Sequence, residues 1–294
     1  MRAVYASDPH GEIPLYQELL DLAHSFMAEI LAIGGDLLPS FPPSKRYEEM
    51  VPNQKKFVDQ FLLPFFERMI QTTIVRRIFL IPGNWDLGYP YLFKRPIKEL
   101  IDLSQKFHRL RGGYEIIGYP FVPPTPFRPK DFEKMDDPDS PWPPQKNPSY
   151  IRSKDRTDQL IPIDPHLYLR KRETIQEDLD HLPKPKDPKR TIYVMHSPPF
   201  GTKLDQIEGG SFKGSRSIRR FIKNTQPLLT LHGHIHEAPR LSGSYLDRIG
   251  KTLCVNPGQF TLSKKGVTKL HAITFEIETI EETLRHTFFN EDQN

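Results

Sequence analysis

The stretch Pro227-Leu228-Leu229-Thr230-Leu231-His232-Gly233-His234-Ile235-His236 guides the interpretation of the whole chain. Its apolar half is typical of a buried strand, and its polar half begins where such a strand would end. His234 and His236 are two residues apart, so a regular strand would hold their imidazoles well separated. A loop at the strand end can instead turn them toward two adjacent ions, because neutral imidazole is the commonest metal ligand in proteins. The alternative is a pair of surface histidines in a turn.

Four further apolar runs are each followed by polar residues that could bind a metal ion. The runs cover residues 2–6, 30–33, 78–81 and 191–195. The polar residues that follow them are Asp8, His10, Asp36, Asn84 and His196. Alternation of strands and helices favours a largely parallel sheet, whose ligands bind at the carboxyl ends of the strands. The sequence therefore predicts one site built from five strand ends.

Together with His234 and His236, these residues offer two carboxylates, one amide oxygen and four imidazoles, with no thiolate. This set is larger than a single zinc site needs. The mixture of nitrogen and oxygen suits two divalent ions such as Mn, Fe, Zn or Ni. A carboxylate between two ions can bridge them. Ions about 3.5–4 Å apart can clamp the attacking and leaving oxygens of a phosphoryl transfer, while a bridging water becomes hydroxide near neutral pH.

Length and composition suit a soluble globular protein of one large α/β domain or two modest ones. The chain has 294 residues, of which 37% are hydrophobic and 27% charged, enough to bury a substantial core. The net charge of +4 is compatible with anionic substrates and with an ordinary mixed surface. It lacks the strong basic footprint expected for tight binding to a nucleic acid backbone.

Several features predict a cytoplasmic protein without a membrane segment. No run of eighteen apolar residues is present, and the N-terminus leads directly into an apparent strand rather than a signal peptide. Cys254 is the only cysteine, so an intrachain disulfide is impossible, which fits a reducing compartment.

The remaining elements follow from hydrophobic periodicity and turn residues. Helices are predicted over Leu15–Ala28, over Asn53–Thr72 with Asn53 as its cap and a break at Pro64, over Ile97–Phe107, over Pro165–Leu182, and over the basic segment Ser215–Asn224. Strands are predicted over Tyr114–Gly118 and near 240–246, 251–256 and 269–277, with turns at Ser242-Gly243 and Lys265-Gly266.

Residues 119–165 interrupt this regular pattern. About half of the 30 prolines lie between Pro120 and Pro188, and residues 119–165 also carry mixed charges and scattered aromatic residues. A segment this long inside a compact domain is usually a binding loop or lid, or is disordered, and the aromatic residues favour an ordered one. We therefore expect a single domain, residues 1–294, with an insertion at about 119–165 that forms a lid.

Five short blocks resemble the signature blocks of the calcineurin-like metallophosphoesterases, in the order that this family shows. The blocks are Asp8-Pro9-His10, Gly34-Gly35-Asp36, Gly83-Asn84-Trp85-Asp86, His196 and Gly233-His234-Ile235-His236. Each block alone is a weak signal, but five in order, each after an apparent strand, are a strong one. The resemblance covers roughly residues 1–260, and it includes His196-Ser197-Pro198-Pro199 and Asn256-Pro257-Gly258 as neighbouring segments.

The resemblance implies an α/β four-layer αββα sandwich of two mixed sheets flanked by helices. It also implies a ligand for each position. Asp8, His10 and His236 would hold one ion, Asn84, His196 and His234 the other, and Asp36 would bridge them. Asp36, Asn84 and His234 are the residues expected to serve catalysis, and manganese is the favoured metal. His232 is expected to point away from this site.

Trp85 departs from the family pattern. The third block usually reads Gly-Asn-His followed by Asp or Glu, and that histidine is thought to stabilise charge or protonate the leaving group. An indole N–H can donate a hydrogen bond but cannot act as an acid near pH 7. His108, His166 or an arginine of the insertion could replace the missing acid, or the substrate could have a good leaving group. Asp86 would then be a helix-starting aspartate.

These features predict a metal-dependent phosphoester hydrolase that uses a dimetal centre and a bridging hydroxide and favours phosphodiesters or other activated phosphoesters. The expected partner is a small-molecule phosphoester, with nucleic acid not favoured and no membrane. Two alternatives stay open: a catalytically impaired metal-binding interaction module, and a nuclease. The basic helix near Arg219 could recognise phosphate or could be an ordinary solvated face.

Overall fold

The computed structural model describes residues 1–40, 46–156, 158–259 and 269–288. Two six-stranded sheets form its centre, in the orders β14-β13-β1-β2-β3-β4 and β11-β12-β10-β9-β6-β5. The strands of the first sheet are β1 (Arg2–Ala6), β2 (Ile30–Ile33), β3 (Arg77–Leu80), β4 (Leu100–Asp102), β13 (Ala272–Glu276) and β14 (Arg285–His286). Those of the second are β5 (Phe107–Arg109), β6 (Glu115–Tyr119), β9 (Thr191–Met195), β10 (Leu229–Leu231), β11 (Leu246–Ile249) and β12 (Thr252–Val255).

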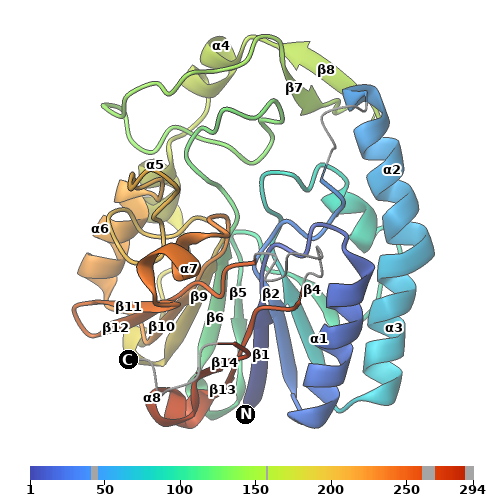
Figure 1. The fold of residues 1–294 in the computed structure, drawn as a ribbon, viewed down its shortest axis with the longest axis vertical. Coiled ribbons are helices and arrows are strands. Elements are labelled where there is room, and N and C mark those ends of the chain that lie inside the picture. The colour runs from blue at the N-terminus through green and yellow to red at the C-terminus, as the bar shows by residue number, and fades with distance from the viewer. Residues whose placement is uncertain (41–45, 157, 260–268, 289–294) are drawn as a thin grey trace.

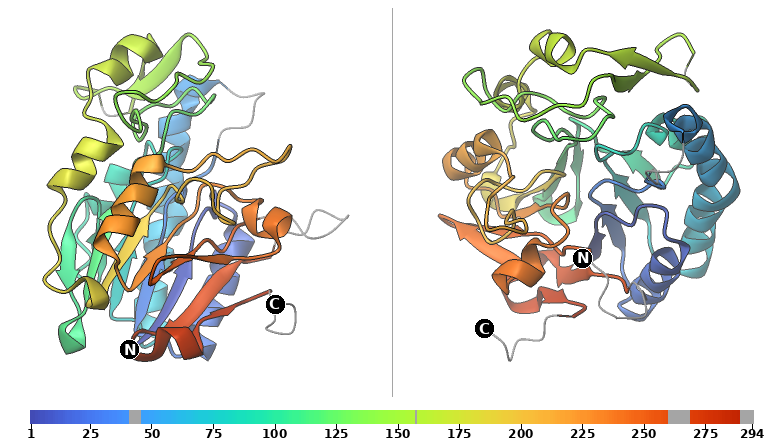
Figure 2. Two further views of the ribbon diagram at one scale, coloured as in Figure 1. Left: turned by 90° about the vertical axis from the view of Figure 1, so that its left-hand side faces the viewer. Right: turned by 45° about the horizontal axis from the view of Figure 1, so that its top comes forward.

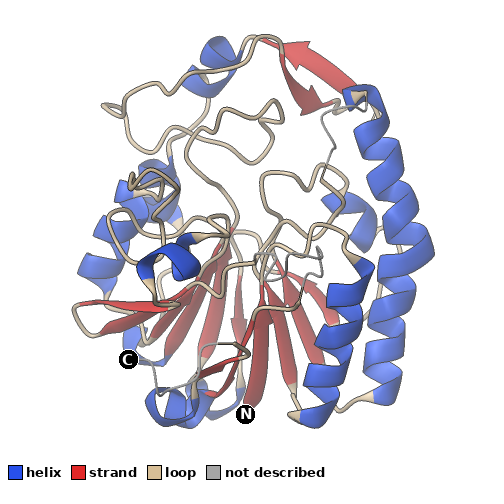
Figure 3. Cartoon of the chain, viewed as in Figure 1, coloured by secondary structure: helices blue, strands red, loops and turns tan. Residues whose placement is uncertain are grey.

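Both sheets are mixed, and their central strands are parallel. In the first sheet, β1 to β4 run parallel and β13 joins β1 antiparallel. In the second, β6, β9, β10 and β12 run parallel, with β5 and β11 antiparallel at the two edges. The parallel strands of each sheet therefore end at a common edge, and Figure 3 shows the loops gathering above the strands there.

Alternate residues of the central strands face different layers, as the two-residue period of a strand requires. Val4 packs on the helix side of the first sheet, whereas Tyr5 lies between the sheets with Ile192 of β9. Tyr193 faces the outer side of the second sheet. Helices cover both outer faces (Figures 1 and 2). The predicted four-layer αββα sandwich is thus confirmed.

Helices α1 (Ile13–Ser25), α2 (Met50–Phe57) and α3 (Leu63–Thr72) cover the first sheet, and α5 (Ile175–His181) and α6 (Arg216–Thr225) cover the second. A wide π turn, Val58–Leu62, joins α2 to α3 just before Pro64. Proline lacks an N–H and crowds the preceding turn, which accounts for this break in the predicted helix. Asn53 lies inside α2, because the helix begins at Met50, so its predicted capping role is wrong.

Three other predicted elements differ from the structure. The segment Ile97–Phe107 contains the short strand β4, which extends the edge of the first sheet, instead of a helix. The predicted helix Pro165–Leu182 is two helices, α4 (Pro165–Arg170) and α5, because Thr174 and Glu177 form a capping box that starts a new helix. Residues 238–242 form helix α7 (Ala238–Ser242), which ends at Gly243, and the following strand is β11.

The predicted turn at Lys265-Gly266 lies outside the described residues. No helix within the described ranges is long and apolar enough to cross a membrane.

The insertion at 119–165 is an ordered loop with one hairpin, formed by β7 (Ser149–Arg152) and β8 (Leu160–Ile163). It crosses above the loop-bearing edge of both sheets and approaches the N-terminal end of α2 (Figure 1). Asp136 connects the insertion to helix α6. The Asp136 carboxylate accepts hydrogen bonds from the Ser215 hydroxyl and from the backbone N–H groups of Arg216 and Ser217 at the start of that helix.

Candidate metal centre

The carboxylate of Asp8 lies where β1 ends and reaches the second sheet. It is buried and accepts hydrogen bonds from the backbone N–H of His234, 3.1 Å from each carboxylate oxygen. Nε2 of His236 lies 3.3 Å from its Oδ1, and Nε2 of His196 lies 4.0 Å from the same oxygen. Asp8 therefore joins the end of β1 to the ends of β9 and β10.

Asp36 lies between two histidines from different sheets. Its Oδ2 is 3.6 Å from Nε2 of His10 and 3.5 Å from Nε2 of His196. Its Oδ1 accepts a hydrogen bond of 2.9 Å from the backbone N–H of Trp85. A carboxylate in this position has the geometry needed to bridge two ions.

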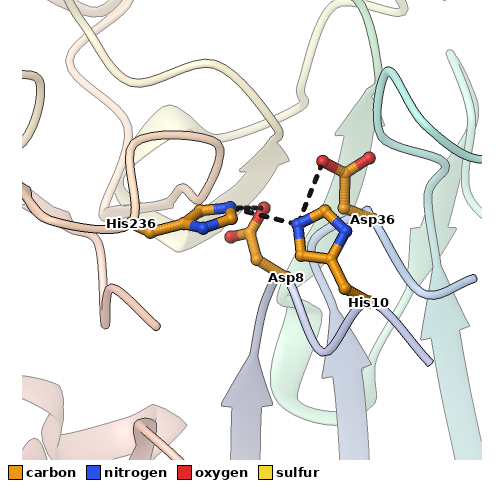
Figure 4. A group of neighbouring side chains, drawn as sticks. All are labelled: Asp8, His10, Asp36 and His236. Carbon is orange, nitrogen blue, oxygen red and sulfur yellow. Dashed lines mark hydrogen bonds and ion pairs between the residues drawn. The ribbon is translucent and has the colours of Figure 1, made fainter. Parts of the chain in front are cut away.

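His10 and His236 point at each other. Their Nε2 atoms are 3.2 Å apart, and Figure 4 shows both rings directed toward the space beside Asp8 and Asp36. Suitable ligand atoms of Asp8, His10, Asp36 and His236 all lie within 4.8 Å of one another. Two facing ring nitrogens beside two carboxylates form a group that could hold a cation.

His196 and His234 form the neighbouring group, with ring centroids 5.2 Å apart. Nδ1 of His196 lies 2.7 Å from the backbone oxygen of Gly34. A histidine that donates from one ring nitrogen to a carbonyl offers the other as a metal ligand, and this orienting contact is usual at metal sites. Nε2 of His196 is thereby directed toward Asp36.

Buried atoms without partners mark the same place. Oδ1 of Asn84, Nε2 of His196 and Nδ1 of His10 are buried and have no hydrogen-bond partner in the described part of the chain. Buried polar atoms are nearly always hydrogen-bonded, so these atoms indicate a further partner. Oxygen and imidazole nitrogen are ligands for divalent ions, and the residues present thus fit a dimetal centre.

Left-handed backbone conformations aim the side chains of this site. Asp8, His10, Asp36 and His234 have φ values of 58°, 45°, 51° and 67°. Such values are uncommon outside glycine and cost conformational free energy, and they collect at functional sites. A regular strand would hold the imidazoles of His234 and His236 well separated, and the left-handed turn at His234 changes the direction of the chain between them.

Two glycines let the backbone approach the carboxylates. A Cβ atom on Gly83 would lie 2.2 Å from Oδ1 of Asp36, and one on Gly233 would lie 2.4 Å from Oδ2 of Asp8. Any side chain at either position would displace the carboxylate. The glycines of the third and fifth sequence blocks are thus required by close packing rather than by flexibility.

Burial and charge have opposing effects on the ionisable groups. Burial raises the pKa of Asp8, but the imidazoles of His236 and His196 outweigh it and hold the pKa below the usual range. Burial lowers the pKa of His196, but the Asp36 carboxylate raises it to about 9. Burial lowers the pKa of His234 to about 3, which keeps this imidazole neutral and able to bind a metal. The two carboxylates thus favour positive charge at the centre.

Asp86 has a different role from the predicted one. Instead of starting a helix, its carboxylate accepts hydrogen bonds from the backbone N–H groups of Leu37, Leu38 and Gly83, at 3.0, 2.8 and 2.9 Å. Burial, and then the nearby Asp36 charge, raise the pKa of Asp86 to about 7. Asp86 thus holds the loop after Asp36 against the loop that carries Asn84.

Asn256 is a second positioning residue that sequence reasoning did not single out. Its side-chain NH₂ group lies 3.0 to 3.3 Å from the backbone oxygens of Leu204, Gly233 and Ile235. It thus shapes the loop that carries His234 and His236. The resemblance of Asn256-Pro257-Gly258 to a family segment was the available signal. His232 is buried, with Nε2 2.8 Å from the Thr230 hydroxyl, and belongs to the support of this loop.

The two histidines suggested as replacements for the missing acid lie on elements outside this cluster, whereas the suggested arginine of the insertion stays a prediction. His108 of β5 pairs with Ile116, which pairs with Ile192 near the start of β9, whereas the cluster lies beyond the end of β9. His166 packs on Trp142 in the insertion, with ring centroids 4.6 Å apart. The insertion approaches the cluster through Phe127, whose ring centroid lies 5.1 Å from that of Trp85.

Comparisons with known proteins agree with this geometry. A crystal structure aligned with 98% of this chain and 99% of its own has a TM-score of 0.57 at 16% identity. The crystal structure of TT1561 of Thermus thermophilus aligns over 97% of both chains, with a TM-score of 0.54 and 16% identity. At this identity the two likenesses show the fold alone. A search of the curated proteins found no match.

The family model described as calcineurin-like phosphoesterase matches residues 1–238. That range includes every residue of the cluster, from Asp8 to His236, and most of both sheets. This chain therefore belongs to the calcineurin-like phosphoesterase family.

Proposed function

We propose that this protein hydrolyses phosphoesters with a dimetal centre, and that it favours phosphodiesters or other activated phosphoesters. The observation that carries the proposal is the convergence of Asp8, His10, Asp36 and His236 within 4.8 Å, beside the unpartnered Nε2 of His196. Manganese is the proposed metal, since a ligand set of imidazole and oxygen without thiolate suits it. A small-molecule phosphoester is the proposed substrate.

Each ion would have its own set of protein ligands. Asp8, His10 and His236 would hold one ion, Asn84, His196 and His234 the second, and Asp36 both. Bound ions would supply a hydroxide nucleophile near neutral pH and neutralise charge on the phosphate. Trp85 can donate one hydrogen bond from its indole but no proton, so the leaving group must depart without a histidine acid. This requirement favours a diester or another substrate with a good leaving group.

The test is hydrolysis by protein that has been stripped with a chelator and reloaded with manganese. The substrates are bis(p-nitrophenyl) phosphate and p-nitrophenyl phosphate, which release the same chromophore from a diester and a monoester. We expect turnover of the diester to exceed that of the monoester, and both to depend on the added metal. Asn84→Ala, which removes one proposed ligand, is the control for contaminating phosphatases.

Two results would contradict the proposal. Activity above the Asn84→Ala background in protein shown by mass spectrometry to lack metal would exclude the proposed centre. Two bound ions without turnover of either substrate would favour the second candidate, a metal-binding interaction module. The observation behind that candidate is Trp85, which stands where the family usually has a histidine.

We further infer a cytoplasmic location and a single functional domain that includes the insertion. The lone Cys254 is buried and cannot form a disulfide within the chain, which supports a reducing compartment. Hydrogen bonds from the start of α6 to Asp136 support an insertion that is part of the domain.

A further inference from the structure

Trp85 replaces a family histidine and connects the candidate metal centre to the insertion. Its backbone N–H donates to Oδ1 of Asp36 at 2.9 Å, and its backbone oxygen accepts from Nε2 of Gln54 at 2.7 Å. Its ring is partly buried against the core of the first sheet. Its ring centroid lies 5.1 Å from that of Phe127, with the two planes inclined at 51°. The residue that carries one ring of this aromatic pair is therefore bonded through its backbone to the carboxylate proposed to bridge the ions.

Phe127 is exposed despite this contact. The side chain is 41% accessible, among the most exposed large apolar residues in the described ranges. A phenylalanine that served only to close the insertion onto the site would be expected to bury more of its ring, since burial of apolar surface is what stabilises such a contact. The accessible part of the Phe127 side chain, which also contacts Trp85, is available to another aromatic group.

The segment that carries Phe127 is held in place. The backbone N–H of Phe127 donates to the Thr125 hydroxyl at 3.2 Å. The Glu133 carboxylate accepts hydrogen bonds from the backbone N–H of Thr125 and from the buried ammonium group of Lys130. The next residue, Arg128, accepts a backbone hydrogen bond of 2.8 Å from Tyr150. A surface that is fixed before binding loses little conformational entropy when a ligand stacks on it.

We propose that Trp85 and Phe127, here called the aromatic platform, bind an aromatic group of the phosphoester substrate, and specifically the base of a nucleoside phosphoester. A base gains binding free energy when it stacks on an aromatic side chain, whereas an alkyl ester has no such group. The position of Trp85 next to Asp36 allows the phosphate to lie at the metal centre while the base reaches the platform. This inference rests on the proposed function, because it uses the same site.

The first measurement is intrinsic fluorescence, which does not require turnover. The chain has two tryptophans, so Trp142→Phe leaves Trp85 as the sole tryptophan fluorophore. Trp142 packs on His166 and Arg170 of α4, so this change should leave the site in place. We expect adenosine 5′-monophosphate to quench Trp85 emission saturably. Ribose 5-phosphate, which has the phosphate and sugar without the base, should not quench it.

The second measurement uses Phe127→Ala with a matched control. Phe107→Ala removes a phenylalanine of similar exposure, 43%, from β5 at the edge of the second sheet. We expect Phe127→Ala to weaken the binding of adenosine monophosphate on the order of tenfold, while Phe107→Ala binds it like the parent. In kinetics, the KM advantage of thymidine 5′-p-nitrophenyl phosphate over methyl p-nitrophenyl phosphate should collapse in Phe127→Ala alone.

The outcomes separate the platform from the reaction. Equal quenching by adenosine monophosphate and ribose 5-phosphate would overturn the proposed base binding, even if the protein hydrolyses the methyl ester. The same conclusion would follow if Phe127→Ala left an observed nucleotide preference unchanged. Quenching by the nucleotide alone, without turnover of any ester, would support the platform and contradict the proposed hydrolysis. A ten-nucleotide oligothymidine that binds far more tightly than the mononucleotide would overturn the small-molecule assignment in favour of single-stranded nucleic acid.

Discussion

The strand-end loops and the insertion both bury carboxylates, but they use them differently. Asp36, in a strand-end loop, lies 3.5 and 3.6 Å from two imidazole nitrogens, beside buried atoms that have no partner in the described residues. Glu133, in the insertion, lies 2.7 Å from the ammonium group of Lys130 and accepts hydrogen bonds from Thr125. Asp136 there is bound by the start of α6.

Buried charged groups thus have different roles in the two regions. A buried ion pair whose remaining atoms are hydrogen-bonded holds a segment in one conformation, as the insertion is held. A group of carboxylates and imidazoles with unsatisfied atoms fits a cation as the further partner. The strand-end loops thus form the candidate metal centre, and the insertion contacts it through Phe127 and Trp85.

The largest expected effect is the loss of the metal centre in Asp36→Asn. The amide cannot provide the anionic oxygen, Oδ2, that lies toward both His10 and His196, so bound metal and hydrolysis should both be lost. Mass spectrometry of the native protein and the diester assay check this result. Asp59→Asn, an exposed aspartate on the π turn, is the matched control and should retain both. Full metal content with full activity in Asp36→Asn would show that the Asp36 carboxylate is not needed for metal binding.

Trp85→His should increase monoester turnover on the order of 10²-fold, since an imidazole can protonate the leaving group and general acid catalysis is typically worth about 10²–10⁴-fold. The ratio of monoester to diester kcat is the quantity to measure. Trp85→Phe, which removes the indole N–H without adding an acid, should leave that ratio near the parent value. An equal rise in both variants would show that space, rather than a proton donor, limits the monoester.

Asp86→Asn should weaken metal binding or activity by about 10–100-fold, as is usual when a group that positions the ligands is changed. Its amide can accept fewer of the three backbone hydrogen bonds from Leu37, Leu38 and Gly83. Titration of the stripped protein with manganese measures the change. Affinity equal to the parent's would show that Asp36 is held in place without Asp86.

Asp136→Ala tests the other region. Removal of this carboxylate leaves the N–H groups of Arg216 and Ser217 without their acceptor, which should lower the free energy of unfolding by about 1–3 kcal/mol. Chemical denaturation checks this value, with the exposed Asp139→Ala as the control. Manganese affinity should be little changed. A large loss of manganese affinity with an unchanged free energy of unfolding would show that Asp136 serves the metal centre and does not stabilise the insertion.

The smallest expected effect is a dependence of stability on pH away from both regions. Burial lowers the pKa of His271 to about 3, with a smaller contribution from His286, and burial lowers that of His286 to about 4. The unfolded chain binds protons near pH 6.5, whereas these folded imidazoles do not, so their contribution is present above pH 6.5 and declines as the pH falls toward 4. Denaturation midpoints of His286→Gln should decline less steeply across this window.

The sequence predicted the strands that carry the candidate site better than it predicted the helices around it. The apolar runs before Asp8, Asp36, Asn84, His196 and His234 are buried on both faces, which leaves an unambiguous pattern, and each is a strand. By contrast, Ile97–Phe107 has apolar residues at spacings that suit a helix, yet β4 forms there because it pairs with β3. Short segments follow tertiary contacts more than local propensity.

By itself, the amino-acid sequence determined the central strands and the short blocks at their ends, because these are local properties, and the resemblance of those blocks implied the family and the four-layer fold. Only the tertiary structure decided how those residues meet. The left-handed turns at Asp8 and Asp36 aim the side chains. The role of Asp86 and the contact between Phe127 and Trp85 depend on segments that are far apart in the chain. Such contacts depend on the packing of two sheets and an insertion, which no local pattern contains.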